Sequence, residues 1–177
     1  MMKNLLKLTL AVVFVFGAMS ASAQKLGRVD LAAIIPNMTE FKDAQSKLET
    51  YGNELSLQLE QMQVEFTTKY SEYEKNMSTY SDSIRQMKER ELMEMQQRFS
   101  DMQQMAQQDI QRKEAELMEP IYKKADEAVR KIATAGAYTV IFSTTGDQAS
   151  SAGLAYFDPK QVTDVTAEVK KALGITE

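Results

Sequence analysis

The side chains that could carry chemistry in this 177-residue sequence are its acidic residues, its serines and its methionines. Cysteine and histidine are both absent, which removes thiol chemistry together with the commonest general base and metal ligand. The serines have no imidazole partner, and no P-loop or G-x-G-x-x-G segment is present. Nothing distinguishes a catalytic pair among the 25 acidic residues. We therefore expect no catalytic residue, no cofactor and no metal site, and we predict that the protein is not an enzyme.

Methionine is the distinctive residue, with 12 copies. Its flexible, polarisable side chain lets a surface re-pack around different partners. Met62 and Met77 fall on a regular apolar stripe, where the simpler interpretation is a seam between helices. Met93 and Met105 fall off that stripe and favour an exposed, adaptable surface. The candidate contact residues for a bound polypeptide are Leu57, Met62, Phe66, Tyr73, Met77, Tyr80, Met93 and Met105.

All eight candidates lie in one long stretch that is expected to be helical, residues 38–133. Apolar side chains recur there at a mean spacing of about 3.6 residues, which is the helical period. Small polar residues cluster at 78–83, where we predict a hairpin tip with Asp82 or Ser83 as the helix cap; one unbroken helix is the alternative. The arms would then run antiparallel, with the numbers of facing residues summing to about 162.

Four further signals concern the ends and the continuity of the arms. Asn37 or Thr39 is expected to cap the first arm, and Pro120 to kink the second arm or start a fresh helical segment there. Gly52 lies inside the first arm, where it is either a bend or a tolerated irregularity. Gly136 should end the second arm.

Residues 1–23 are typical of a cleavable signal peptide. Lys3 and Lys7 precede a short apolar run, and Ala21-Ser22-Ala23 predicts cleavage after Ala23. A retained membrane anchor is the alternative. We expect export to the periplasm. The loss of two lysines would make the mature chain more acidic than the net charge of −4 of the full sequence, which argues against nucleic acid as a partner.

The remaining segments, 24–37 and 134–177, predict a small β-rich body. Strands are expected at 24–30, 137–143 and 154–157, followed by a helix that Thr163 caps and Gly174 stops. Asp30 should cap a short helix that Pro36 interrupts. The fold class is thus α+β and mostly helical, with a long, antiparallel, coiled-coil-like hairpin inserted into the body.

A body of this size is near the lower limit for an independent core, and its strands would have open edges. We therefore expect the body to form a homo-oligomer. The candidate interface residues are Leu26, Val29, Val140, Phe142, Leu154 and Tyr156.

This order of elements resembles the Skp/OmpH family of periplasmic chaperones. The resemblance rests on Arg28-Val29-Asp30, the hairpin, Tyr138 to Phe142, and the stretch from Ala155-Tyr156 through Asp164 to Val169. It covers essentially the whole mature chain, although its motifs are diffuse patterns.

The resemblance implies a jellyfish-like homotrimer whose arms enclose unfolded outer-membrane proteins. It also implies ATP-independent holding of those chains until they reach the outer membrane, with a transient contact at the membrane surface. The well-known members are basic, whereas this chain is acidic, so apolar and methionine contacts would have to take a larger share. The alternative function is a structural coiled-coil spacer or tether of the cell envelope.

Overall fold

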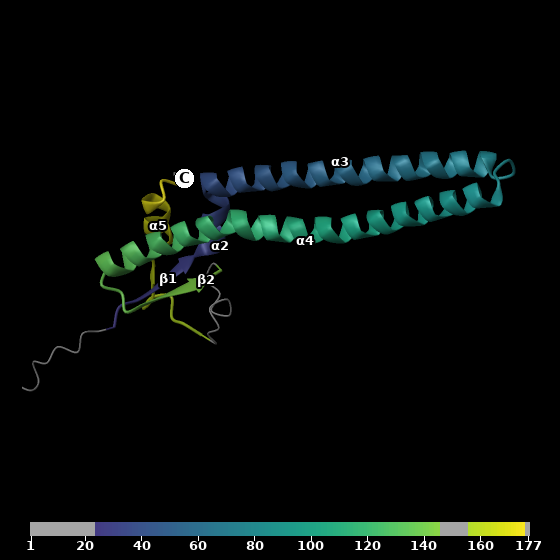
Figure 1. Ribbon diagram of the computed structural model, residues 1–177. Coiled ribbons are helices and arrows are strands. Elements are labelled where there is room, and N and C mark those ends of the chain that lie inside the picture. Colours follow the sequence, from purple (N-terminus) through teal and green to yellow (C-terminus); the bar gives the residue numbers. More distant parts are fainter. Residues whose placement is uncertain (1–23, 146–155, 176–177) are drawn as a thin grey trace, which may run out of the picture.

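Two long helices dominate the computed structural model, which describes residues 24–145 and 156–175. Helix α3 (Thr39–Asn76) runs outward from a small body, and helix α4 (Asp82–Ala135) returns beside it (Figure 1). The pair projects far beyond the strands and the short helices (Figure 1). The mostly helical architecture with a small strand region confirms the α+β class predicted from the sequence.

The hairpin turns between Asn76 and Asp82, and this turn overlaps the tip predicted at 78–83. Ser81 is the residue that caps α4, and its hydroxyl oxygen accepts a hydrogen bond from the Ile84 N–H at 3.4 Å. The predicted caps Asp82 and Ser83 are therefore wrong, because both lie inside the first helical turn. Ser81 takes the extended backbone (φ −64°, ψ 157°) that a capping residue needs.

The first arm also starts differently from the prediction. Met38 is its capping residue and forms no side-chain hydrogen bond to the helix. Asn37 instead donates from its amide to the Ala33 carbonyl at 2.9 Å, and Thr39 is already helical, so neither predicted cap is correct. The Met38 residue is 1% exposed, so this position is occupied by a buried apolar side chain rather than by a polar cap.

Before that point, β1 (Leu26–Asp30) leads into helix α2 (Leu31–Ile34) and the 3₁₀ turn η1 (Ile35–Asn37). Asp30 caps α2 by accepting from the Ala33 N–H at 3.0 Å, which confirms that prediction. Pro36 lies within the 3₁₀ turn, where the chain leaves the α-helical geometry.

The body contains a three-stranded parallel sheet in the order β2-β1-β3. Strand β2 (Val140–Thr144) aligns Leu26 with Val140, and β3 (Thr163–Asp164) aligns Gly27 with Thr163. The expected strand at 154–157 is wrong for its described part, because Tyr156 and Phe157 are not in a strand; Leu154 lies outside the described residues. Thr163 belongs to a strand rather than a helix cap, and α5 (Thr166–Ala172) begins three residues later.

The core lies between the sheet and the helices α2, α4 and α5. Its buried members are Val29, Ile34, Met38, Ala44, Ile121, Ala125, Ala128, Val165 and Val169. Val29 is 2% exposed within its own chain, so its assignment to an oligomer interface is corrected. Helix α4 continues through Pro120 as one element, and the predicted fresh segment is not formed. Ile121 and Ala125, which follow the proline on α4, are buried in the core.

Glycines end both helices that were predicted to stop at them. Gly136 is the C-cap of α4, and its N–H bonds to the Ile132 carbonyl at 2.9 Å. The left-handed backbone at this end belongs to Ala137 (φ 52°) rather than to Gly136. Gly174 follows α5 with a φ of 73°, a conformation that glycine adopts without steric cost.

Candidate functional site

The seam between α3 and α4 buries few side chains completely. Beyond the body, Leu55, Met95 and Ala106 are 5–7% exposed, while the other apolar residues of the stripe remain partly open to solvent. Two helices alone cannot enclose a wide apolar stripe, because each covers only one side of the other. The hairpin therefore presents apolar surface along its flanks.

Polar contacts across the seam fix its register. Lys69 pairs with Glu91, and Lys124 pairs with Glu40 near the body. The residue numbers of these pairs lie close to the predicted sum of about 162. These ion pairs therefore agree with the antiparallel register expected from a tip at 78–83.

A shallow aromatic groove of about 320 Å³ runs along one flank near the tip. The residues that line it, called the aromatic groove below, are Phe66, Tyr70, Tyr73, Glu89, Leu92, Met93 and Gln96. The rings of Phe66 and Tyr70 are stacked, with centroids 6.0 Å apart and planes 22° from parallel. They are one helical turn apart on α3, and this spacing places both rings on the same flank.

One acidic side chain borders this groove. The Tyr73 hydroxyl donates a hydrogen bond to Oε1 of Glu89 at 2.6 Å, joining α3 to α4. This hydrogen bond raises the pKa of Tyr73 above its usual value, because it stabilises the protonated phenol. Arg85, one turn closer to the tip, is held by Asp82 at 3.8 Å. Glu89 is thus the single charged residue among those lining the groove.

The neighbouring flank has a different chemistry. Lys69, Lys88 and Glu91, called the ionic cluster below, line a second hollow together with Glu72. Hydrogen bonds from Lys69 and Lys88 lower the pKa of Glu91, and the bond to Glu91 raises the pKa of Lys69. Glu91 and Met93 are two residues apart on α4 and therefore about 200° apart around the helix. The side of the ionic cluster, called the ionic side below, also holds Tyr80 and shares Tyr73 and Leu92 with the aromatic groove, so the two sides differ mainly in their charged residues.

The predicted contact residues are only partly brought together. Phe66, Tyr73 and Met93 line the aromatic groove. Tyr80 packs against Tyr73, with ring centroids 6.4 Å apart, and Met62 lines a separate hollow beside Met95. The remaining three lie outside these hollows and are 46–57% exposed: Leu57, Met77 and Met105.

The prediction missed four groove residues. They are Tyr70, Glu89, Leu92 and Gln96, none of which is among the contact residues expected from the sequence. The available signal was the spacing of Phe66 and Tyr70, which indicates a shared flank. Glu89 and Gln96 could be assigned to the groove only once the register of the two arms was known.

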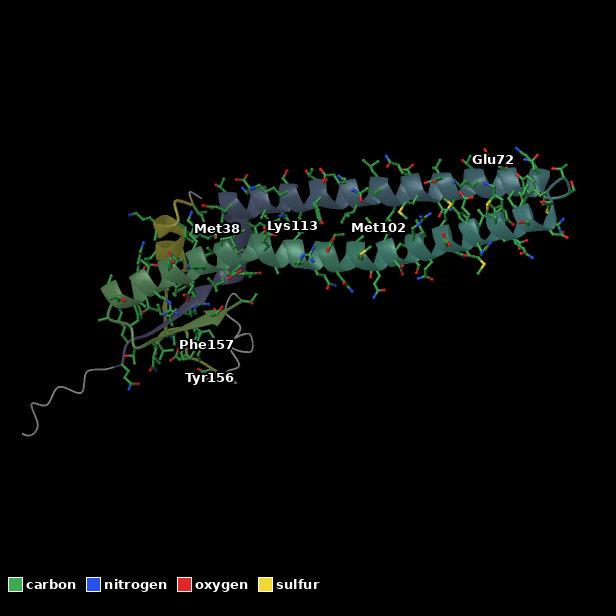
Figure 2. The ribbon with its side chains drawn as sticks, in the orientation of Figure 1. Met38, Glu72, Met102, Lys113, Tyr156 and Phe157 are labelled. Atoms are coloured by element: carbon green, nitrogen blue, oxygen red, sulfur yellow. The ribbon has the colours of Figure 1, made fainter. Side chains whose placement is uncertain are left out.

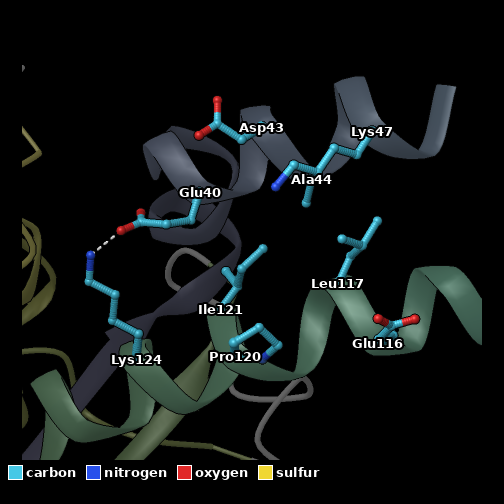
Figure 3. A pocket seen from close by; sticks show the side chains of 9 residues that line it. All are labelled: Glu40, Asp43, Ala44, Lys47, Glu116, Leu117, Pro120, Ile121 and Lys124. Atoms are coloured by element: carbon cyan, nitrogen blue, oxygen red, sulfur yellow. Dashed lines mark hydrogen bonds and ion pairs between the residues drawn. The ribbon is translucent and has the colours of Figure 1, made fainter. Parts of the chain in front are cut away.

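A mixed-charge hollow of about 310 Å³ lies where the arms leave the body (Figure 3). Glu40 on the first turn of α3 accepts from Lys124 on α4, and this bond lowers the pKa of Glu40. Pro120 and Leu117 lie on the opposite wall, on α4 (Figure 3). The ion pair fastens the base of one arm to the other.

The sheet has two unlike faces. Helices α4 and α5 lie over one face, whereas Tyr156 and Phe157 lie on the side away from α4 (Figure 2). Side chains alternate along a strand, so Leu26 and Phe142 point away from the face that holds Val29. Parallel sheets are usually covered on both faces. In the part of the chain that the structure describes, helices cover only the face that holds Val29.

Several predicted interface residues are accessible on this body. Val140 is 40% and Tyr156 is 78% exposed, while Leu26 and Phe142 are partly buried; Leu154 lies outside the described residues. Within residues 24–145 and 156–175, no cluster of three acidic side chains could hold a metal ion. No helix in the same segments has the length and apolar character needed to cross a membrane.

Comparisons with known proteins agree with one another. The family model described as outer membrane protein (OmpH-like) matches residues 25–173. The chaperone protein Skp of Yersinia enterocolitica is 27% identical over 152 residues, which cover 86% of this chain and 87% of that protein. A crystal structure described as an OmpH-like outer membrane chaperone, from Caulobacter crescentus CB15, superposes with a TM-score of 0.70 at 12% identity. That match covers 87% of this chain and 86% of the other.

Proposed function

This chain belongs to the OmpH-like outer membrane protein family, and from that premise we propose that it is an ATP-independent holdase for unfolded outer-membrane proteins. In this function the hairpin binds a precursor before it folds and keeps it from aggregating. The fold agrees with the similarity of sequence, because the same architecture recurs in an OmpH-like structure.

The observation that supports this function best is the accessible apolar surface of the arms. Leu57, Met93 and Met105 are 52–67% exposed on helices that project beyond the body, and Met93 also lines the aromatic groove. Contiguous exposed apolar surface marks interaction sites, and the lining of the aromatic groove is mostly apolar and aromatic. Shallow, methionine-containing surface suits many weak contacts with chains of different sequence.

The functional assembly in this proposal is a homotrimer with three arms around a shared cavity. The face of the parallel sheet that points away from α4 supports it, since among the described residues Val140 and Tyr156 are exposed there and a partner would bury them together with Leu26 and Phe142. Native mass spectrometry with small-angle scattering tests this assembly. A trimer with three protruding arms is expected, and a monomer at micromolar concentration would contradict it.

The proposed place of action is the periplasm, with a transient contact at the outer-membrane surface. Residues 1–23 would direct export and be removed after Ala23, which makes Gln24 the first mature residue. Sequencing the N-terminus of the protein recovered from the periplasmic fraction tests this directly. A mature chain that retains residues 1–23 would contradict it.

Selectivity for unfolded chains distinguishes a holdase from a tether. A fluorescently labelled outer-membrane protein is diluted from urea into the full chain without ATP, and anisotropy reports binding. The same labelled protein, folded in detergent micelles, is the control. Binding of the unfolded form alone is expected; tight binding of the folded form and none of the unfolded form would indicate a tether.

A further inference from the structure

The two flanks of the hairpin near its tip offer different chemistry to a bound chain. The ionic cluster is already paired within the protein, with Lys88 at 3.1 Å from Glu91 and Lys69 pairing with the same carboxylate. The aromatic groove has partly open rings and thioether, and Tyr70 and Met93 are 45% and 67% exposed. The groove is therefore the side whose side chains have exposed surface left for a bound chain.

The residues that line the groove favour a positively charged side chain in a bound polypeptide. Faces of aromatic rings carry negative electrostatic potential and attract Lys and Arg side chains. Glu89 adds a full negative charge at the rim, and one of its carboxylate oxygens accepts from Tyr73 while the residue stays exposed. Since no lysine or arginine lines the groove, a cationic side chain is attracted there and an anionic one is repelled.

The apolar part of the groove fits the neighbours of such a cation. Leu92 and Met93 provide adaptable apolar walls, and the Gln96 amide can donate to or accept from an extended backbone. Strands of outer-membrane β-barrels alternate apolar and polar residues and carry girdles of aromatic residues. Successive side chains of a regular strand point to opposite sides. An unfolded segment is not held in that geometry, so it can turn a basic side chain and a neighbouring aromatic ring into one groove.

The geometry points to the aromatic groove as a site for extended segments of unfolded chains in which arginine or lysine alternates with aromatic or aliphatic residues. This specificity rests on the proposed holdase function and names the class of segment that the arm takes. It also assigns the groove side of the hairpin, rather than the ionic side, to the bound chain.

Short unstructured peptides test the specificity on the full chain. One peptide alternates tyrosine and leucine with arginine, and its matched control carries glutamate in place of arginine. Glu89→Gln removes the charge but keeps a hydrogen-bond acceptor for Tyr73, and Glu72→Gln on the ionic side is its control. Met93→Ser removes an exposed apolar contact, and Met87→Ser, 52% exposed and not among the groove residues, is its control.

The proposal expects the arginine peptide to bind more tightly than the glutamate peptide. Glu89→Gln should weaken the arginine peptide about threefold, as for an exposed ion pair, and leave the glutamate peptide unweakened. Met93→Ser should weaken both peptides, while the two controls change neither. Equal affinities for the two peptides, or equal effects of Glu89→Gln and Glu72→Gln, would overturn it.

The outcome can be separated from a failure of the holdase function. If the wild-type chain binds an unfolded outer-membrane protein but Glu89→Gln and Met93→Ser act like their controls, the groove assignment is overturned and the holdase function stands. If the wild-type chain binds no unfolded outer-membrane protein, both proposals fall.

Discussion

The ring of Tyr138 packs against the α-carbon of Gly136 so closely that a Cβ atom on this glycine would lie 2.4 Å from Cε2. The same ring carries Lys25 over its face, with Nζ 4.1 Å from the centroid, and Lys25 also donates to the Gly136 carbonyl at 3.0 Å. The end of α4 is thus fastened to the start of β1 by a contact that requires the absence of a side chain.

Substituting Gly136→Ala should therefore destabilise the body. The new methyl group displaces the Tyr138 ring and disturbs the Lys25 contact, at a cost of about 1–3 kcal/mol, as for overpacking elsewhere. Urea denaturation followed by circular dichroism measures the free energy of unfolding.

Gly52→Ala is the matched control for that substitution. Gly52 lies inside α3, and a Cβ atom there would meet no heavy atom within 4 Å. The alanine should stabilise the protein by about 0.5–1 kcal/mol through helix propensity. Equal effects of the two substitutions would contradict the proposed packing at Gly136.

Leu55 and Leu57 should separate stability from binding. Leu55 is 7% exposed in the seam, so Leu55→Ala should cost about 2 kcal/mol of unfolding free energy. Leu57 is 57% exposed, so Leu57→Ala should leave the unfolding free energy almost unchanged while weakening the binding of an unfolded outer-membrane protein. Thermal unfolding and anisotropy titrations measure the two effects; a large loss of stability in Leu57→Ala would contradict the assigned exposure.

Acid should loosen the attachment of β3 to β1. Burial disfavours the charged form of Asp164, but hydrogen bonds from the Thr166 hydroxyl and N–H, with the charge of Arg28, outweigh it and lower the pKa of Asp164. A lowered pKa in the folded state contributes stability above the unfolded value of 3.8, and this contribution is lost as the pH falls through the folded pKa. The melting temperature of the wild type should fall below about pH 4.

Asp164→Asn isolates this contribution. The variant should melt below the wild type at pH 7 and approach it in acid, because the amide cannot form the ion pair with Arg28. Glu40 and Glu91 also have lowered pKa values and remain in the variant, so its melting temperature still falls in part. A constant difference between the two proteins from pH 7 to acid would contradict the role of Asp164.

Tyr73 should ionise above the usual pH of a phenol. Its hydrogen bond to Glu89 favours the protonated phenol and raises the pKa of Tyr73 above 10.0. The cross-arm bond is therefore intact below that pH and lost as the pH rises through the raised value. Ultraviolet titration of the wild type and of Tyr73→Phe should show that the late-ionising phenol disappears in the variant; unchanged late titration would assign it to another tyrosine.

The local signals of the sequence predicted the elements that depend on neighbouring residues. Helical periodicity gave the paired arms, and Asp30 and Gly136 were identified as caps from residue type alone. The tip needed a finer distinction, because Ser81, Asp82 and Ser83 are all capable caps. Only the backbone conformation of Ser81 decides among them.

Features that depend on contacts between distant residues could not be predicted in the same way. Strand β3 has only two residues, and it forms because Thr163 and Asp164 align with β1. Val29 is expected at an interface because its strand lies in a small body with open edges, yet it is 2% exposed in the core of its own chain. The aromatic groove likewise combines Tyr73 and Glu89 from different arms, and their proximity depends on the register of the hairpin.

The central claim, holding of unfolded outer-membrane proteins, is tested most directly by light scattering. An outer-membrane β-barrel protein is diluted from urea into buffer without ATP, with and without a stoichiometric amount of the trimer. The proposed function predicts that scattering stays near the baseline when the trimer is present. A rise in scattering equal to that in buffer alone would contradict it.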